Sequence, residues 1–257
     1  MKYLVSNYHA HTTRCGHAFG TEREYIEAAI ECGIREFGFS DHAPIPYEKN
    51  FVSGIRMGME QAEEYVNTLR KLGEEYKNDI HIYVGFEAEY LEEYFEEQMK
   101  CYDALGIDYL ILGQHFNKSE KTGPYNAHET TDYKQLSEYV DVVIKAAQTG
   151  RYLYIAHPDI INFVGDKKVY EKEMIRLCTA MKELNIPLEI NVLGAFYKRN
   201  YPCEAFFDIA SKVQNDVILG LDAHTVDQIY NLKTYEECMD MVKRKGLHLL
   251  DRMEIIK

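Results

Sequence analysis

Histidine and carboxylate residues recur where apolar, strand-like runs of this chain end. Residues 3–8 lead into His9 and His11, and residues 36–40 lead into Asp41 and His42. Four later runs are residues 81–86, 109–113, 152–156 and 217–221. They are followed by Glu87, by Gln114 and His115, by His157, and by the pair Asp222 and His224. Imidazole and carboxylate groups are ligands that zinc, manganese and iron take in proteins. The repeated pattern therefore predicts a metal site.

His9 and His11 are separated by a single residue. In extended backbone two such side chains leave the same face of the strand, so their imidazoles can share one metal ion. The spacing alone is weak evidence, because short motifs arise by chance and the two histidines could simply be exposed. Asp222 and His224 repeat the spacing near the other end of the chain. A pair at each end implies that the first and last strands meet.

Glu87 ends an otherwise apolar strand. Alone, it would be interpreted as a solvated residue just past the sheet edge. Glu89 points to the same side of the strand, but its role as a ligand is more ambiguous. Beside several histidines, a glutamate can bridge two cations about 3.5 to 4 Å apart, an arrangement suited to phosphoryl hydrolysis. His115 and His157 would in isolation be ordinary polar residues near a core. Their placement after strands makes them expected ligands.

Two further histidines are candidates. His17 lies in the loop that follows His11, so it either completes another metal site or faces solvent. Asp41 and His42 are adjacent, and adjacent side chains in a strand point to opposite sides. We expect His42 to be a ligand and Asp41 to be an orienting group or a proton-transfer candidate.

The apolar runs alternate with amphipathic stretches of helical spacing, and residues 187–190 form a seventh run. This alternation predicts parallel β-α-β units, whose right-handed crossovers place the carboxyl ends of all strands on one face. An open doubly wound sheet would gather ligands near a few strands, whereas a barrel gathers them from most strands. Because ligands follow every run except residues 187–190, the pattern favours an α/β barrel with seven strands.

The composition is that of an ordinary globular protein. With 257 residues, of which 46% are hydrophobic and 28% charged, the chain can form a single domain over residues 1–257. No apolar run approaches the ~18 to 20 residues that span a membrane, and residues 1–9 lack the features of a signal peptide. We therefore expect a cytoplasmic protein.

Charge and cysteine content argue against other classes. The formal net charge of −13 disfavours a nucleic-acid partner, since such binding depends on Lys and Arg neutralising phosphates. A small anionic substrate is compatible with this charge, because bound cations can reverse the sign of an acidic site. The six cysteines form no CxxC pair, so neither a disulfide framework nor a thiolate zinc site is expected.

The ordered set of candidates resembles the PHP (polymerase and histidinol phosphatase) family over essentially the whole chain. The residues that carry the resemblance are His9, His11, His17, Asp41, His42, Glu87, His115, residues 156–158, Asp222 and His224. The resemblance implies a distorted (β/α)7 barrel with three divalent metal ions, zinc, iron or manganese, at the carboxyl ends of the strands. By position, one metal would be held by His9, His11, Glu87 and Asp222, a second by Glu87, His115 and His157, and a third by His17, His42 and His224.

Enzymes of this kind hydrolyse phosphate esters, and the segments after His157 and around residues 199–202 look most like histidinol-phosphate phosphatases of the family. The resemblance therefore implies a phosphomonoesterase that converts L-histidinol phosphate to L-histidinol in histidine biosynthesis. The cations would bind phosphate oxygens and activate a bridging water for in-line attack on phosphorus. Asp222, or a nearby histidine such as His224, would protonate the leaving alkoxide.

Loop residues are candidates for substrate binding. Arg199 follows the sixth strand and could clamp a phosphate bidentately, with a solvated surface arginine as the alternative. Phosphatases of this group carry an arginine shortly after the AHP motif (residues 156–158 here), but residues 160–163 contain none, so Arg56 or Arg14 would have to compensate. His128, in the polar loop of residues 117–131, could also contact substrate.

Two alternatives to a histidinol phosphatase stay open at this point. One is a related enzyme that acts on another small phosphate ester or a nucleotide. The other is a non-catalytic metal-binding protein, although nine separate ligands around a cleft favour catalysis. The sequence does not determine the oligomeric state.

Overall fold

The strands form a curled, parallel sheet in two sections. The structure is a computed structural model that describes residues 4–48 and 50–255. One section has the strand order β1-β2-β3-β4 and the other β5-β6-β7, and neighbouring strands in both are parallel. The strands are β1 (Ser6–Asn7), β2 (Glu36–His42), β3 (His81–Ala88), β4 (Tyr109–Leu112), β5 (Leu188–Asn191), β6 (Asp216–Gly220) and β7 (His248–Leu249).

Single bridges close the two sections into a barrel. Ile155 bridges both Leu112, at the end of β4, and Leu188, at the start of β5. On the other side of the barrel, Ala10, which follows β1, bridges Ala223, which follows β6. The first and last ligand-bearing strands therefore meet.

The expected α/β barrel is confirmed, with two differences at the level of strands. The fifth run, residues 152–156, forms bridges at Ile155 rather than a continuous strand. It ends at His157, whose φ of 30° lies outside the extended region. β7 was not expected, and it pairs with the start of β6, at the end of the barrel away from the ligands. Both features distort the barrel.

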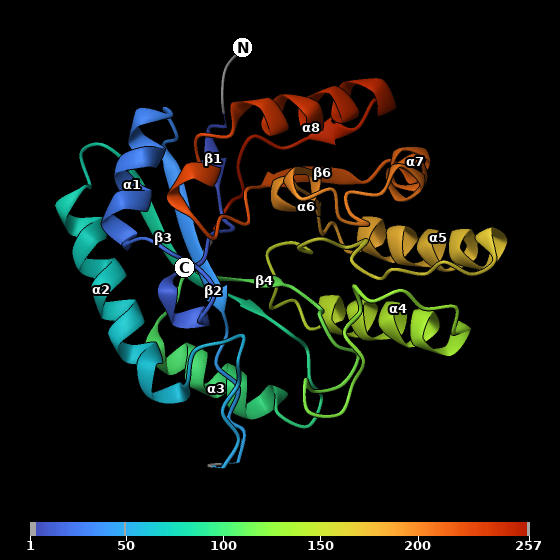
Figure 1. The fold of residues 1–257 in the computed structure, drawn as a ribbon, viewed down its shortest axis with the longest axis horizontal. Helices are drawn as coiled ribbons and strands as arrows, with labels where there is room; N and C mark the ends of the chain where they lie inside the picture. The colour runs from blue at the N-terminus through green and yellow to red at the C-terminus, as the bar shows by residue number, and fades with distance from the viewer. Residues whose placement is uncertain (1–3, 49, 256–257) are drawn as a thin grey trace.

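Helices lie around the outside of the strands (Figure 1). They are α1 (Glu22–Glu31), α2 (Ala62–Glu75), α3 (Phe95–Leu105), α4 (Tyr133–Gln148), α5 (Lys167–Glu183), α6 (Val192–Phe196), α7 (Glu204–Val213) and α8 (Leu232–Lys245). The short helix α6 follows β5 directly and breaks the alternation of one helix per strand. In the described part of the chain, no helix combines the length and apolarity needed to cross a membrane.

Aromatic side chains fill the barrel below the ligands. Tyr8, Tyr109 and Tyr154 belong to a small buried cluster, separate from the larger core between strands and helices. The Tyr109 hydroxyl donates a 2.8 Å hydrogen bond to the carbonyl of Tyr8. Two inward-facing glycines leave room for this side chain, because a Cβ atom on Gly38 would lie 2.2 Å from its hydroxyl oxygen and one on Gly85 2.6 Å from its ring. The barrel interior is thus packed with aromatic side chains below the ligands.

Candidate metal centre and active site

Glu87, at the end of β3, lies at the centre of the predicted ligands and is 2% exposed. Its Oε1 lies 2.7 Å from His157 Nε2 and 3.5 Å from His115 Nε2. Its Oε2 lies 2.9 Å from His42 Nδ1, and His9 Nε2 lies 3.6 Å from Oε1. Imidazoles from four other strands or runs therefore surround one carboxylate, as its predicted bridging role requires.

Asp222 forms a second point of convergence. Its Oδ1 lies 3.0 Å from His11 Nε2 and 3.4 Å from His9 Nε2. His224 Nδ1 lies 3.5 Å from the same oxygen. The backbone of Asp222 has a φ of 52°, a conformation that non-glycine residues seldom adopt. Such strain is typical of functional sites, where the surrounding structure enforces it.

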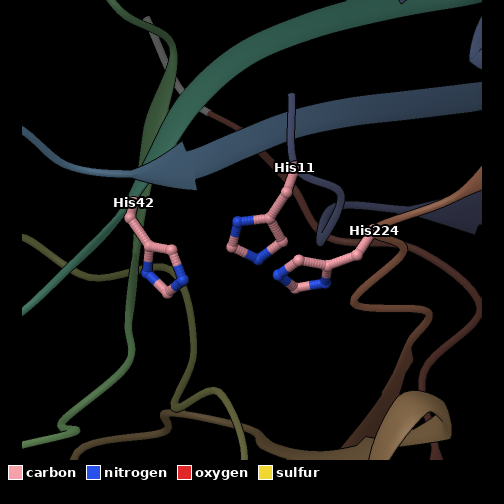
Figure 2. A group of neighbouring side chains, drawn as sticks. All are labelled: His11, His42 and His224. Atoms are coloured by element: carbon pink, nitrogen blue, oxygen red, sulfur yellow. The ribbon is translucent and has the colours of Figure 1, made fainter. Parts of the chain in front are cut away.

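Figure 2 shows the rings of His11, His42 and His224 facing a common space. One ring nitrogen of each lies within 4.8 Å of the others. His17 stacks against His224 with ring centroids 4.8 Å apart, and its ring lies 5.4 Å from that of His42. The structure thus brings the expected third set of ligands together and adds His11 to it.

Several buried polar atoms in this cluster lie close to one another but make no hydrogen bond of acceptable geometry. They are His9 Nε2, His11 Nε2, His42 Nδ1, His157 Nδ1 and Glu87 Oε2. Leaving a buried donor or acceptor without a partner costs about 1–3 kcal/mol, so such atoms are rare in native proteins. Imidazole and carboxylate lone pairs that converge in this way suit divalent cations. The residues present therefore fit a metal centre.

The charges of the cluster are strongly coupled. Burial lowers the pKa of His9, but the carboxylates of Glu189, Asp222 and Glu87 outweigh burial and raise that pKa to about 10. Burial raises the pKa values of Glu87 and Asp222, but neighbouring histidines outweigh it and hold both well below their usual range. Burial, with the charge of a neighbouring histidine, lowers the pKa of His224 to about 3. The pKa of each of these groups is therefore set by its neighbours in the cluster, and the role of Asp222 or His224 as the general acid stays a prediction.

Three more buried carboxylates face the outer ring nitrogens of candidate ligands. Glu189 Oε1 lies 2.8 Å from His9 Nδ1, Glu89 Oε1 lies 3.2 Å from His115 Nδ1, and Asp41 Oδ1 lies 3.4 Å from His11 Nδ1. A carboxylate at the outer nitrogen selects the tautomer and turns the other nitrogen toward the metal. Glu189 was not expected from the sequence, because it lies within a strand rather than after one.

Asp41 is enclosed by the loop that carries the first ligands. It accepts hydrogen bonds from the Thr12 main-chain nitrogen at 3.1 Å, from the Thr12 hydroxyl, and from the His42 main-chain nitrogen at 2.8 Å. Its side chain is fully buried and does not line the cavity above the ligands. Of the two roles expected for Asp41, the geometry favours orientation over proton transfer, and the ring that it orients is His11 rather than His42.

A cavity of about 420 Å³ opens over the cluster. The candidate ligands that line it are His17, His42, Glu87, His115, His157, Asp222 and His224. Arg199 lines the same cavity, and its Nη1 donates a 2.6 Å hydrogen bond to the Tyr201 hydroxyl. The volume is in the range of small-molecule sites. Arg199 therefore lies beside the space that a small molecule bound to the metals would occupy.

Arg56 and His128 do not line this cavity. The buried Arg56 guanidinium donates to Glu89 Oε2 at 3.2 Å and lies 3.5 Å from Glu120 Oε2. These contacts direct Arg56 toward Glu89 and Glu120 rather than into the cavity above the candidate ligands. His128 is exposed, and its ring packs edge-on against Tyr125 at 5.3 Å. Neither side chain lies at the cavity, and the substrate contacts expected of both residues stay predictions.

The cysteine spacing predicts no thiolate ligand, but Cys15 is buried beside the candidate ligands. Its sulfur and nitrogen atoms of His17 and His224 all lie within 4.8 Å of one another. The same is true of Cys15 with His11 and Asp41. No CxxC pair marks Cys15 in the sequence. The one signal was its position in the loop between His11 and His17, two candidate ligands.

The sequence matches the PHP domain family model over residues 7–192. This chain belongs to the PHP domain family. Asp222 and His224 lie beyond residues 7–192, the segment that matches the family model. Their place beside the other candidate ligands rests on the closure of the barrel.

Named relatives of this PHP protein include phosphatases. A Deinococcus radiodurans protein named probable histidinol-phosphatase is 26% identical over 232 residues, which cover 86% of each chain. The histidinol-phosphatase of Bacillus subtilis is 28% identical over 134 residues, or 50% of each chain. The crystal structure of histidinol phosphate phosphatase from Lactococcus lactis, complexed with zinc, L-histidinol and phosphate, has a TM-score of 0.71 at 17% identity and covers 97% of this chain and 98% of that chain. This likeness shows a common fold.

Proposed function

We propose that this PHP protein is a metal-dependent phosphomonoesterase that hydrolyses L-histidinol phosphate to L-histidinol and phosphate. The observation that carries the proposal is the convergence of buried, unpartnered imidazole and carboxylate atoms beneath a cavity that also presents Arg199. Cations that bind phosphate oxygens stabilise the charge of the transition state in hydrolysis of a phosphate ester. The names of the bacterial relatives, and the zinc, L-histidinol and phosphate held by the Lactococcus lactis protein, support the choice of substrate.

The proposed cofactor is a set of three divalent ions of zinc, iron or manganese. The residues that would hold them are His9, His11, His17, His42, Glu87, His115, His157, Asp222 and His224. When bound, such ions polarise phosphoryl oxygens and lower the pKa of water. Imidazole and carboxylate ligands accommodate each of these metals, so availability would decide which one is bound.

Residues of the chain itself would bind and orient the ester. Arg199 can donate two parallel hydrogen bonds to a phosphate. The ring of Tyr197, 5.5 Å from the guanidinium carbon, and the hydroxyl of Tyr201 hold Arg199 at the cavity. Phe116 and Tyr125 line the same cavity and offer flat apolar surfaces to the organic part of the substrate.

The second candidate substrate is another small phosphate ester or a nucleotide, since residues 160–163 contain no arginine. A non-catalytic metal protein is less well supported, because the cavity leaves room for a substrate beside the ligands. The net charge of −13 argues against a nucleic-acid partner. We also propose that the protein acts in histidine biosynthesis, that it is cytoplasmic, and that residues 1–257 form a single domain.

The test is phosphate release by metal-reconstituted protein from histidinol phosphate, nucleoside monophosphates and an aryl phosphate. We expect the highest kcat/KM for histidinol phosphate. Equal values across the panel would contradict this substrate, and no release from any ester by metal-loaded protein would contradict the enzymatic proposal.

Variants of two histidines test the site itself. His9→Ala should lose both bound metal and activity. The control His248→Ala changes an exposed histidine that pairs with Asp216 away from the cavity, and it should retain both.

A further inference from the structure

None of the proposed metal ligands directly follows β5, but the strand itself carries two polar side chains. Glu189 and Asn191 occupy alternate positions, so both point into the barrel, and both are 0% exposed. Leu188 and Ile190 belong to the core between strands and helices. Burial of an acid and an amide is costly unless specific partners satisfy them.

Glu189 contacts two of the proposed metal ligands. Its Oε1 lies 2.8 Å from His9 Nδ1, and its Oε2 accepts a 2.9 Å hydrogen bond from the main-chain nitrogen of His157. The φ of His157 is 30°, which is unusual for a residue other than glycine. One carboxylate therefore orients the ring of His9 and holds the strained backbone of His157.

Asn191 extends this network to a third proposed ligand. Its Nδ2 donates to Glu189 Oε2 at 2.9 Å and to Asp222 Oδ2 at 3.1 Å. Asp222 also has a positive φ, of 52°. Ligands from three other parts of the barrel are thus tied to one strand.

Gly220 on β6 keeps space for the Glu189 carboxylate. It pairs with Asn191 in the sheet, and a Cβ atom at position 220 would lie 1.8 Å from Glu189 Oε1. Gly220 is not among the glycines with positive φ, so its backbone conformation does not itself require glycine. The absence of a side chain at this position therefore serves the carboxylate.

The charge of Glu189 is balanced differently from that of Glu89. Glu89 pairs with the permanent cation of Arg56, whereas the hydrogen-bond partners of Glu189 are His9, a main-chain nitrogen and an amide. We propose that Glu189 is a positioning residue that keeps Nε2 of His9 directed inward and, with Asn191, holds His157 and Asp222 in place for metal binding. This role rests on the proposed metal centre. Partners of this kind are typically worth ~10- to 100-fold in metal affinity or activity.

Glu189→Gln tests the proposal by removing the charge at nearly constant volume. We expect zinc, titrated into metal-free protein, to bind ~10- to 100-fold more weakly. We also expect kcat to fall with little change in KM, because Arg199 still contacts the phosphate. The control Glu173→Gln changes another buried carboxylate, on α5, which pairs with Arg176, and should leave zinc affinity unchanged. Equal zinc affinity in the wild type and Glu189→Gln would overturn the proposal.

Gly220→Ala tests the same role without altering the carboxylate, and it decides the question if Glu189→Gln does not fold. The added methyl must displace Glu189, so zinc affinity should fall in the wild-type background. It should not fall further in a Glu189→Ala background, where the space is free. An equal loss in both backgrounds would overturn the proposal. These readouts do not depend on hydrolysis, so absent phosphate release by the wild type loaded with zinc, iron or manganese would defeat the proposed function separately.

Discussion

The carboxylate of Glu87 occupies the space that a side chain on Gly113 would fill. A Cβ atom at position 113 would lie 1.9 Å from Glu87 Oε1 and 2.5 Å from its carboxyl carbon. Both residues are inward-facing and lie on or next to adjacent strands, since β3 pairs with β4. The central acidic group of the candidate centre is therefore placed by a missing side chain on the neighbouring strand.

Gly113→Ala should move this carboxylate and reduce metal binding and turnover together. Displacements of about 1 Å in a catalytic arrangement can cost ~100-fold in rate, and we expect kcat to fall on that scale. Gly73→Ala is the control. Gly73 lies in α2, and a methyl group there would make an ordinary van der Waals contact of 3.4 Å with Ile82 on β3. That control should keep full activity and gain roughly 0.5–1 kcal/mol of stability. Normal zinc content and turnover in Gly113→Ala would contradict the central role of Glu87.

Arg199 is the one Lys or Arg among the described residues that lines the cavity. Arg199→Ala should raise KM for a phosphate ester ~10- to 100-fold, because a charged hydrogen bond is worth about 1.5–3 kcal/mol. Steady-state kinetics on the metal-loaded protein measure this change. Arg23→Ala removes an exposed arginine that pairs with Glu75 on the helical surface and should change neither constant. An unaltered KM in Arg199→Ala would show that the arginine does not bind the phosphate.

Arg56 and Glu89 form a buried ion pair whose side chains are each 1% exposed. Arg56→Met removes the guanidinium and leaves the buried Glu89 carboxylate without this cation. The free energy of unfolding should therefore fall by about 3–5 kcal/mol. Urea unfolding of the metal-free protein measures this loss. Combining Arg56→Met with Glu89→Leu removes the more deeply buried of the two carboxylates that Arg56 contacts and leaves Glu120, so it should restore part of the stability. A double variant as unstable as the single one would rule out the unpaired charge as the cause.

Asp159 should make stability depend on pH. Burial raises its pKa from 3.8 to about 7. Between these values the folded protein keeps a proton that the unfolded chain has released, so this residue lowers stability as pH rises from about 4 to about 7, and its effect levels off above that. Asp159→Asn should remove this part of the profile and unfold at a higher temperature than the wild type at pH 8. Parallel profiles of the two metal-free proteins between pH 4 and 8 would contradict the prediction.

Most candidate ligands could be predicted because a polar residue directly after an apolar run has one main interpretation in a parallel barrel. The carboxyl ends of the strands share a face, so His9, Glu87 and His157 had to lie near one another once the strands were recognised. Glu189 was missed because it lies inside a strand. A signal was present, since a carboxylate within a strand buried on both faces requires a specific partner.

Two loop residues, Arg56 and His128, could not be placed from the sequence. Arg56 and His128 lie in segments without helical or strand periodicity, so their positions along the chain do not determine where their side chains point. The buried pair between Arg56 and Glu89 depends on tertiary packing that no local pattern encodes. The reduction of the fifth strand to bridges at Ile155 likewise depends on the turn at His157, which becomes visible only in the backbone geometry.

The seam between β1 and β6 also determines when the ligand set is complete during synthesis. His9 and His11 are translated near the beginning of the chain, whereas Asp222 and His224 follow more than two hundred residues later. No nascent chain that stops before residue 224 can supply every ligand, however much of the barrel has already folded. Tight metal binding would therefore come late in the synthesis of the chain. Truncated translation products should bind metal more weakly than the chain that reaches residue 224.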